Sequence, residues 1–277
     1  MHHVTWGASA LDYAPCRYGQ SKLLFRGPKK RLDTKYIAFL GGSRTYGKFV
    51  AAPYADLLAD RLDCAVTNFG CLNAGLDAFV NDDSLMGLCH RAELAVLELQ
   101  GITDISNRFY TVHPRRNDRF VEASPMMKRL FPTADFTEFN FTRHMLKTLE
   151  KQWPERVSLV LDDLRQTWID RSLRLLRELR GRVVLLWMSD HPPPHETTGL
   201  SDQTPEGVSR KMLETIKISA CDYVEIVETR ETRALCNEGK HYLLHEADMA
   251  AALPGPMMHR QVAAALEPVL KKHLSPQ

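Results

Sequence analysis

A serine that directly follows a short apolar run is the first residue in this sequence that could do chemistry. Residues 36–40 are all apolar and lead into Gly41-Gly42-Ser43, a pattern typical of a strand buried on both faces. Ligands of open α/β sheets gather at the carboxyl ends of the strands, where Ser43 would lie. A serine hydroxyl becomes a nucleophile when a base accepts its proton, and His259 is a candidate base. The alternative is a plain turn serine.

The same glycines also allow a second interpretation, a phosphate-binding loop. Residues 42–48 match the pattern Gly-x-x-x-x-Gly-Lys, but the next residue is Phe49, which has no hydroxyl for Mg²⁺. Pro53 suits the first turn of a helix and so places the helix start after Lys48. A phosphate-binding loop needs that lysine in the first helical turn. These two features favour a nucleophile over a nucleotide site.

Composition narrows the class of protein. The chain has 277 residues, of which 44% are hydrophobic, enough to bury a sizeable core. Its formal net charge is only +2, which gives no case for a nucleic-acid or membrane partner. The six cysteines contain no Cys-x-x-Cys pair, and the N-terminus lacks the pattern of a signal peptide. We therefore expect a cytoplasmic protein.

Apolar runs that alternate with helical periodicity predict the architecture. Strands are expected at 36–40, 65–68, 94–99, 183–188 and 223–227, and helices at 54–62, about 156–180, 206–219 and 256–272. This alternation implies βαβ units and a mainly parallel sheet. We predict an α/β fold, a three-layer α/β/α sandwich with a flavodoxin-like sheet of about five strands. Residues 36–277 would form one domain with an insertion at about 102–180, and residues 1–35 an arm packed on it.

An arginine-rich segment follows the third predicted strand. Guanidinium groups suit bidentate recognition of a carboxylate, sulfate or phosphate, so these arginines could hold an anionic part of a substrate over Ser43. The predicted substrate-binding residues are Arg44, Arg108, Arg115, Arg116 and Arg119. The alternative is a solvated loop in which the arginines pair with Asp118 and Glu122.

Two histidine pairs have the four-residue spacing of metal ligands on a helix. The first, His191 and His195, spans three prolines and therefore does not lie on a helix. The second, His241 and His245, has no third ligand at a convincing spacing. We expect neither a metal nor a cofactor.

Two blocks of this sequence resemble the SGNH (GDSL-like) hydrolase superfamily. They are residues 39–47, which contain Ser43, and Asn68-Phe69-Gly70 with Asn73-Ala74-Gly75 after the second strand. The chain most resembles a subgroup of uncharacterised bacterial SGNH-like proteins. The resemblance implies that Ser43 is the nucleophile, that Gly70 supplies an oxyanion donor, and that His259 is the base.

The chain also departs from the superfamily pattern. Gly42 replaces the aspartate of the usual Gly-Asp-Ser, and Thr103 stands where the third block has an oxyanion asparagine, with Asn107 as a possible substitute. Pro256 stands where an aspartate usually orients the base. A Ser–His dyad would then be required, or an acid from another loop. The candidate acids are Asp190, Glu246 and Asp248.

The resemblance thus implies an SGNH-like serine acyl hydrolase, an esterase that acts on a small-molecule or glycan ester, with an anionic ester as one option. Two alternatives stay open. The same scaffold could be an acyl- or sulfo-group transferase, or it could be a catalytically inactive module that binds an anionic ligand. We expect neither nucleic acid nor membrane as a partner, and the sequence leaves the oligomeric state open.

Overall fold

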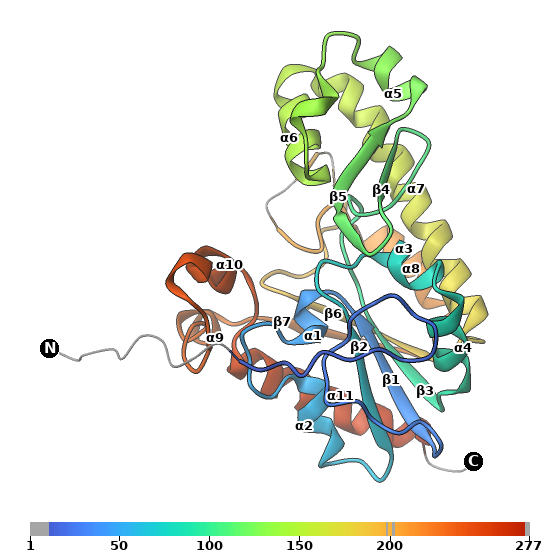
Figure 1. Ribbon diagram of the computed structural model, residues 1–277, viewed down its shortest axis with the longest axis vertical. Coiled ribbons are helices and arrows are strands. Elements are labelled where there is room, and N and C mark those ends of the chain that lie inside the picture. The colour runs from blue at the N-terminus through green and yellow to red at the C-terminus, as the bar shows by residue number, and fades with distance from the viewer. Residues whose placement is uncertain (1–10, 198, 201–202, 275–277) are drawn as a thin grey trace, which may run out of the picture.

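A five-stranded parallel sheet forms the centre of the computed structural model, which describes residues 11–197, 199–200 and 203–274 (Figure 1). The strands are β1 (Tyr36–Gly41), β2 (Ala65–Gly70), β3 (Leu94–Glu98), β6 (Val183–Ser189) and β7 (Asp222–Val227). Their order, β2-β1-β3-β6-β7, is the flavodoxin-like order 2-1-3-4-5. The predicted three-layer α/β/α architecture is confirmed, and each predicted strand is present to within two residues at its ends.

Helices cover both faces of the sheet. One face carries α2 (Tyr54–Ala59) and α11 (Pro256–Leu274), and the other carries α3 (Leu76–Val80), α4 (Asp83–Arg91), α7 (Pro154–Glu178) and α8 (Arg210–Lys217) (Figure 1). In β1, Ile37 and Phe39 pack in the first layer, whereas Ala38 and Leu40 pack in the second. The apolar run in the sequence is unbroken because both faces of the strand are buried.

The order in which strands are added to the sheet reverses between β1 and β3, although all five strands are parallel. The two strands run side by side with Leu40 opposite Leu97, and from there the sheet grows towards β2 on one side and towards β6 on the other. The loops that follow β1 and β3 therefore leave in opposite directions and open a crevice at the carboxyl edge. Ser43 follows β1 and Gln100 follows β3.

The first part of the predicted insertion at 102–180 stands on this carboxyl edge, and its last helix, α7, runs from there down along a face of the sheet (Figure 1). The insertion contains an antiparallel hairpin of β4 (Tyr110–His113) and β5 (Arg116–Ala123), then α5 (Pro125–Leu130), a short 3₁₀ turn (Phe136–Glu138), α6 (Thr142–Gln152) and α7. The arginine-rich segment, interpreted from sequence as a loop, forms this hairpin. Its pairing shifts register twice, which breaks the alternation by which a strand is recognised.

A second group of short elements follows β7 on the same edge. We call it the C-terminal lobe, residues 230–252: it comprises α9 (Arg230–Ala234), the 3₁₀ turn η2 (Leu244–Glu246) and α10 (Ala247–Ala252) (Figure 1). The sequence pattern left this region undefined. Among the described residues, no helix combines the length and the apolar character that a bilayer crossing requires.

Before β1, residues 11–35 run along the surface with three side chains turned into the core. Tyr18, Leu23 and Phe25 are at most 3% exposed, and the rings of Tyr18 and Phe25 both contact the ring of Phe69 on β2. Residues 1–10, which belong to the predicted arm, lie outside the described part of the chain.

Trp168 connects α7 to the loop that follows β3, so we expect its replacement to weaken the fold. The side chain is fully buried and its Nε1–H donates to the carbonyl of Gln100 at 2.9 Å. Trp168→Phe removes this donor and leaves a small void, which should lower the free energy of unfolding by about 1–3 kcal/mol in urea titrations. Leu159→Ala, at a position 56% exposed on the same helix, is the control and should change it by less than about 0.5 kcal/mol. Equal effects of the two variants would contradict this account.

Candidate functional site

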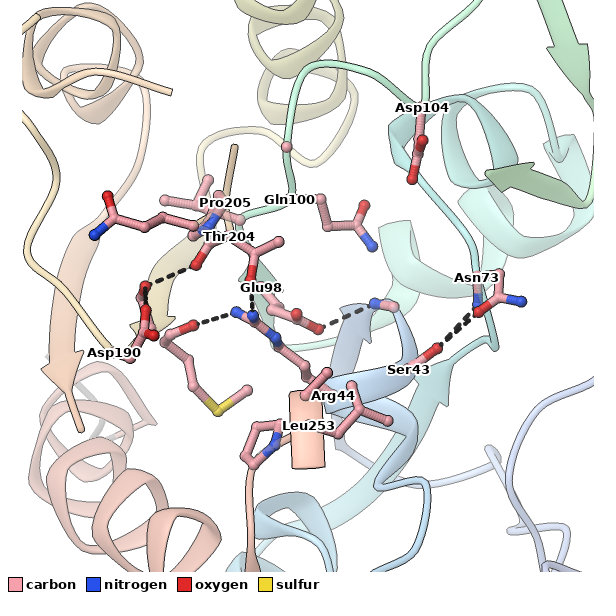
Figure 2. A pocket seen from close by; sticks show the side chains of 18 of the residues that line it. Ser43, Arg44, Asn73, Glu98, Gln100, Asp104, Asp190, Thr204, Pro205 and Leu253 are labelled. Carbon is pink, nitrogen blue, oxygen red and sulfur yellow. Dashed lines mark hydrogen bonds between the residues drawn. The ribbon is translucent and has the colours of Figure 1, made fainter. Parts of the chain in front are cut away.

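A cavity of about 380 Å³ opens at the carboxyl edge of the sheet, and Ser43 lies in its wall (Figure 2). The loops that follow β1, β2, β3 and β6 form its floor. Residues of the insertion and of the C-terminal lobe form its side walls. The polar lining residues are Ser43, Arg44, Asn73, Glu98, Gln100, Asp104, Asp118, Arg143, Ser189, Asp190, Gln203, Thr204, Glu228 and Arg233.

The Ser43 hydroxyl is held by Asn73 (Figure 2). Ser43 is the first residue of α1 (Ser43–Tyr46), and its Oγ accepts the backbone N–H of Asn73 at 3.1 Å. The hydroxyl in turn donates to Asn73 Oδ1 at 3.2 Å. Asn73 has φ of 56°, a left-handed conformation that asparagine tolerates better than most residues. The sequence analysis named Asn73 within the second block of the superfamily resemblance but assigned it no function.

The turn that carries Ser43 is fixed by the carboxylate of Glu98, the last residue of β3. Its Oε2 accepts the backbone N–H groups of Gly42 at 3.0 Å and Thr45 at 3.1 Å, and the Thr45 hydroxyl at 2.5 Å. Burial raises the pKa of Glu98, while the charge of Arg44 and these donors oppose the rise. In the sequence, Glu98 is the one charged residue in the apolar run 94–99, and this could have indicated a buried functional carboxylate.

Arg44 extends from the Ser43 turn to the end of β6. Its Nη1 donates to the carbonyl of Met188 at 2.6 Å, and its Nη2 donates to the Thr204 hydroxyl. Burial lowers the pKa of Arg44, and the negative charges of Glu98, Asp190 and Glu228 oppose this. Of the five arginines predicted to bind substrate, only Arg44 lines the cavity.

The other four predicted arginines belong to the insertion and contact its own residues. Arg108 forms an ion pair with Asp163 at 2.6 Å, and Arg116 forms one with Asp118 at 3.4 Å. Arg119 lies over the ring of Phe141, and Arg115 is exposed between the two hairpin strands. None of these four lines the cavity, and the hairpin contributes Asp118 to it instead.

Gly70, a predicted oxyanion donor, packs directly against the backbone of α1. A Cβ there would lie 2.3 Å from the backbone nitrogen of Tyr46, so only glycine allows α1 to approach β2 this closely. Its N–H donates to Asn68 Oδ1 at 2.8 Å. Gly70 does not line the cavity.

The other two predicted oxyanion donors also contact the protein itself. The Thr103 hydroxyl donates to Glu206 Oε1 at 2.5 Å. Asn107 Oδ1 accepts the backbone N–H groups of Phe109 and Tyr110 and so closes a turn. Neither residue lines the cavity.

Gln100 is the amide that the structure does bring to the Ser43 turn. Its Nε2 donates to the carbonyl of Ala74 at 2.6 Å, and a Cβ on Gly42 would lie 2.8 Å from this nitrogen. The amide nitrogen has a second hydrogen that this bond does not use. Sequence reasoning missed Gln100 because it stands three residues before Thr103, where the superfamily pattern directs attention.

His259 lies in α11 and is 1% exposed. Its Nδ1 accepts the backbone N–H of Tyr54 at 3.2 Å, and its ring stacks on the Tyr54 ring at 5.7 Å between centroids. Burial lowers the pKa of His259 to about 3, with smaller contributions from the charges of Arg26 and Lys240. An acceptor Nδ1 places the proton of the neutral ring on Nε2. Met258, its neighbour, lines the cavity, whereas His259 does not.

The three acids considered as partners of His259 have separate places. Asp190 lines the cavity, where Arg233 Nη1 lies 3.9 Å from one of its oxygens. Glu246 pairs with Lys48 at 3.4 Å, and Asp248 lies in the first turn of α10. None of them bonds to the His259 ring in the part of the chain that the structure describes. 

A carboxylate that the sequence analysis did not single out, Asp104, lines the same cavity as Ser43. Figure 2 shows its carboxyl group directed into the cavity and well apart from the Ser43 hydroxyl, which points to Asn73. The carboxylate accepts the hydroxyl of Thr142 at 2.9 Å, and the oxygen of Thr103, whose proton goes to Glu206, lies 3.2 Å away. Burial raises its pKa to about 6, close to the pH at which a general base works best.

Glu206 lies behind Asp104 and is the second buried carboxylate of this corner. Arg143 Nε lies 2.8 Å from Glu206 Oε2, and Thr103 donates to Oε1. Burial raises the pKa of Glu206 to about 7, although Arg143 opposes this.

Comparison with known proteins gives a family but no activity. A family described as "Domain of unknown function (DUF6473)" matches residues 1–274. A search among curated proteins found no match.

Three solved structures align with the chain at low similarity. The lipase Lip_vut3 from a goat rumen metagenome has 13% identity and a TM-score of 0.40, over 84% of this chain and 97% of the lipase. A Lactobacillus plantarum protein has 14% identity and a TM-score of 0.41, over 87% and 99%. BT4096, a gut microbial diltiazem-metabolizing enzyme, has 14% identity and a TM-score of 0.39, over 89% of this chain and 48% of that one. These likenesses are too distant to assign a function.

The two buried carboxylates should make the fold less stable as pH rises. The native state keeps the Glu206 proton up to about pH 7, whereas the unfolded chain loses it near 4.5, and Asp104 behaves likewise between 3.8 and about 6. The native state therefore binds more protons, and its free energy of unfolding falls between about pH 4 and 7. Glu206→Gln should flatten this slope in urea titrations at pH 5, 6 and 7, whereas the exposed control Glu155→Gln should keep it. An unchanged slope in Glu206→Gln would refute the assignment.

Proposed function

The chain belongs to the DUF6473 family, and from the geometry of its cavity we propose that it is a serine acyl hydrolase with Ser43 as the nucleophile. The observation that carries the proposal is the placement of the Ser43 hydroxyl. It lies in the wall of a cavity at the carboxyl edge of the parallel sheet. The turn that carries it is held by Glu98, and the hydroxyl is hydrogen-bonded to Asn73. Placement of a nucleophile on a rigid turn at this edge is what acyl transfer needs.

In the first step, Ser43 Oγ attacks the carbonyl carbon of an ester and its proton leaves to a base. We assign the base to Asp104, which lines the same cavity and whose pKa is raised to about 6. No hydrogen bond joins Asp104 to Ser43 among the described residues, so in this proposal the proton passes between them through one water molecule. The C–O bond to the alcohol then breaks, and the proton passes from Asp104 to the leaving oxygen. An acyl group stays on Ser43. Water attacks this acyl group in the second step, releases the acid and restores the serine.

The negative charge that develops on the carbonyl oxygen needs donors in place beforehand. Two groups next to Ser43 can serve: the second hydrogen on Gln100 Nε2, and the backbone N–H of Asn73, which now donates to Ser43 Oγ. These donors take the function that the superfamily resemblance implied for Gly70, Thr103 and Asn107.

The same first step also fits an acyltransferase, in which a second alcohol replaces water. Hydrolysis is the simpler proposal, because it needs no second substrate in the cavity. Acyl transfer to an added alcohol, measured as a new ester, would identify the transferase.

Ser43→Ala should abolish both covalent labelling and turnover. A fluorophosphonate reports an activated serine, and we expect it to label the wild type at Ser43 and to leave Ser43→Ala unlabelled, with 4-nitrophenyl acetate hydrolysis reduced at least 10³-fold. Ser158→Ala, on α7 outside the cavity, is the matched control and should label and turn over as the wild type does. Absence of labelling in the folded wild type would favour a binding module instead.

The pH profile should identify the base. A base works only when deprotonated, so with Asp104 in this position kcat/KM should rise with pH through about 6 and level off above 7. Asp104→Asn should reduce kcat/KM about 10²- to 10⁴-fold and remove this rise. With His259 as the base, whose pKa is lowered to about 3, the profile would be flat from pH 4.5 to 8. A flat profile together with an active Asp104→Asn variant would return the base role to His259.

A further inference from the structure

The apolar surface that a ligand can reach in the Ser43 cavity lies on one short segment. Most apolar residues that line the cavity are buried and offer a ligand little surface: Ala74, Leu99, Met188, Pro205 and Met258. In the described part of the chain, the apolar lining residues that are not buried are Ala252, Leu253 and Pro254. These three residues join the C-terminal lobe to α11, and we call them the apolar wall.

The apolar wall is fixed by a lysine and by a small hydrophobic cluster. Lys240 Nζ donates to the carbonyls of Ala250 and Leu253, the second at 2.6 Å, and so satisfies free carbonyls at the end of α10. The Leu253 side chain packs against the cluster that contains Phe49. Phe49 belongs to the loop that follows α1, the helix that begins at Ser43. The apolar wall and the serine are therefore attached to the same loop.

The proposed mechanism gives a direction to three of the four groups on the reacting carbon. Ser43 Oγ is the first, and the carbonyl oxygen points to Gln100 Nε2 and to the N–H of Asn73. The leaving oxygen lies on the side from which Asp104 returns the proton. The fourth group is the acyl chain, which must extend to another part of the cavity. Figure 2 shows Leu253 on the side of the cavity away from Asp104.

Two surfaces remain for the acyl chain, and their chemistry decides between them. Asp190, Glu228 and Arg233 form a charged corner, in which Arg233 lies 3.1 Å from a Glu228 oxygen. A hydrocarbon chain placed there would cover charged groups and remove their hydration, which is costly. Contact with the apolar wall instead removes apolar surface from water on both sides.

We propose that the substrate carries an apolar acyl group longer than acetyl, which lies against the apolar wall, and that Leu253 determines the chain lengths that are accepted. The inference rests on the proposed esterase function, because the mechanism orients the ester. The cavity of about 380 Å³ must also hold the alcohol half, so the acyl group is short. The alcohol half lies among the polar groups on the Asp104 side.

A series of acyl lengths tests the proposal in the wild type. The substrates are 4-nitrophenyl acetate, butyrate, hexanoate and dodecanoate, which share one alcohol. We expect kcat/KM for the butyrate to exceed that for the acetate about tenfold, because two more CH₂ groups are buried on the wall. The dodecanoate should react more slowly than the butyrate, because its chain is too long for the cavity. Equal values for the acetate and the butyrate would contradict the proposal.

Two substitutions locate the acyl surface. Leu253→Trp fills the space beside the wall and should lower the butyrate-to-acetate ratio of kcat/KM at least tenfold. Ala252→Trp, at an exposed position of the wall, should also lower this ratio and is the variant to use if Leu253→Trp does not fold. Leu244→Trp, 86% exposed and outside the cavity, is the control and should keep the ratio. An unchanged ratio in a folded wall variant would overturn the proposal.

A second series varies the alcohol half at constant acyl group. The substrates are methyl, butyl and hexyl acetate, and the release of acetate is measured. Leu253→Trp should leave the hexyl-to-methyl ratio of kcat/KM within twofold of the wild-type ratio. A fall in this ratio together with an unchanged butyrate-to-acetate ratio would place the alcohol half on the wall and refute the assignment.

Binding without turnover separates this proposal from the esterase function. In 4-nitroacetanilide and 4-nitrobutyranilide an amide joins the same two halves, and Ser43→Ala excludes slow cleavage. By titration calorimetry and saturation-transfer NMR, the butyranilide should bind Ser43→Ala at least fivefold more tightly than the acetanilide, and adding Leu253→Trp should remove the difference. If this preference is found but the wild type hydrolyses no ester, the esterase function fails and the acyl site stands. If the wild type hydrolyses 4-nitrophenyl acetate but neither turnover nor binding depends on acyl length, the acyl site fails and the esterase function stands.

Discussion

The carboxylate of Glu98 holds the turn on which the whole site depends. The helix that begins at Ser43 has only four residues, too few to stabilise itself, and its first N–H groups have no partners within it. Oε2 of Glu98 supplies the acceptor for Gly42, for Thr45 and for the Thr45 hydroxyl. Because Glu98 comes from β3 and the turn from β1, the pairing of these two strands also sets the position of Ser43.

A buried carboxylate needs compensation, and here it extends the network across the sheet. Arg44 supplies positive charge next to Glu98 and at the same time donates to Met188 at the end of β6. The Thr45 hydroxyl that bonds Glu98 also lies 2.7 Å from the Tyr54 hydroxyl, which links the turn to α2. The ends of three neighbouring strands and one helix are thus held together through the hydrogen bonds of Glu98, Arg44 and Thr45. Such a network is rigid only while every member has its partner.

The sheet could be predicted from sequence because its signal is local. Each strand is a short apolar run that is buried on both faces, and residues 36–40 and 183–188 show this without interruption. The hairpin in the insertion gave no such signal, since two register shifts break its alternation and its arginines suggested a solvated loop.

The candidate site was predictable only where a residue adjoins a strand end. Ser43 was found because glycines mark its turn. Gln100 also adjoins a strand end, but the superfamily pattern pointed to Thr103 instead. Asp104 was not found, because it comes close to the loop after β2 only in the folded chain, and no spacing in the sequence indicates this. Gly75 in the loop after β2 packs closely against Asp104 in the loop after β3. A Cβ added to Gly75 would lie only 3.1 Å from the Asp104 Cβ, so the glycine allows the two loops to approach each other.

The contacts of His259 differ from those of a base that is oriented by an aspartate. Such a base donates from Nδ1 to the carboxylate and keeps Nε2 free to accept a proton. In this chain Nδ1 instead accepts the backbone N–H of Tyr54, which places the proton of the neutral ring on Nε2. The ring then serves as a packing and hydrogen-bonding partner of α2. In our proposal the proton acceptor for Ser43 therefore comes from another element, and the insertion supplies it in Asp104.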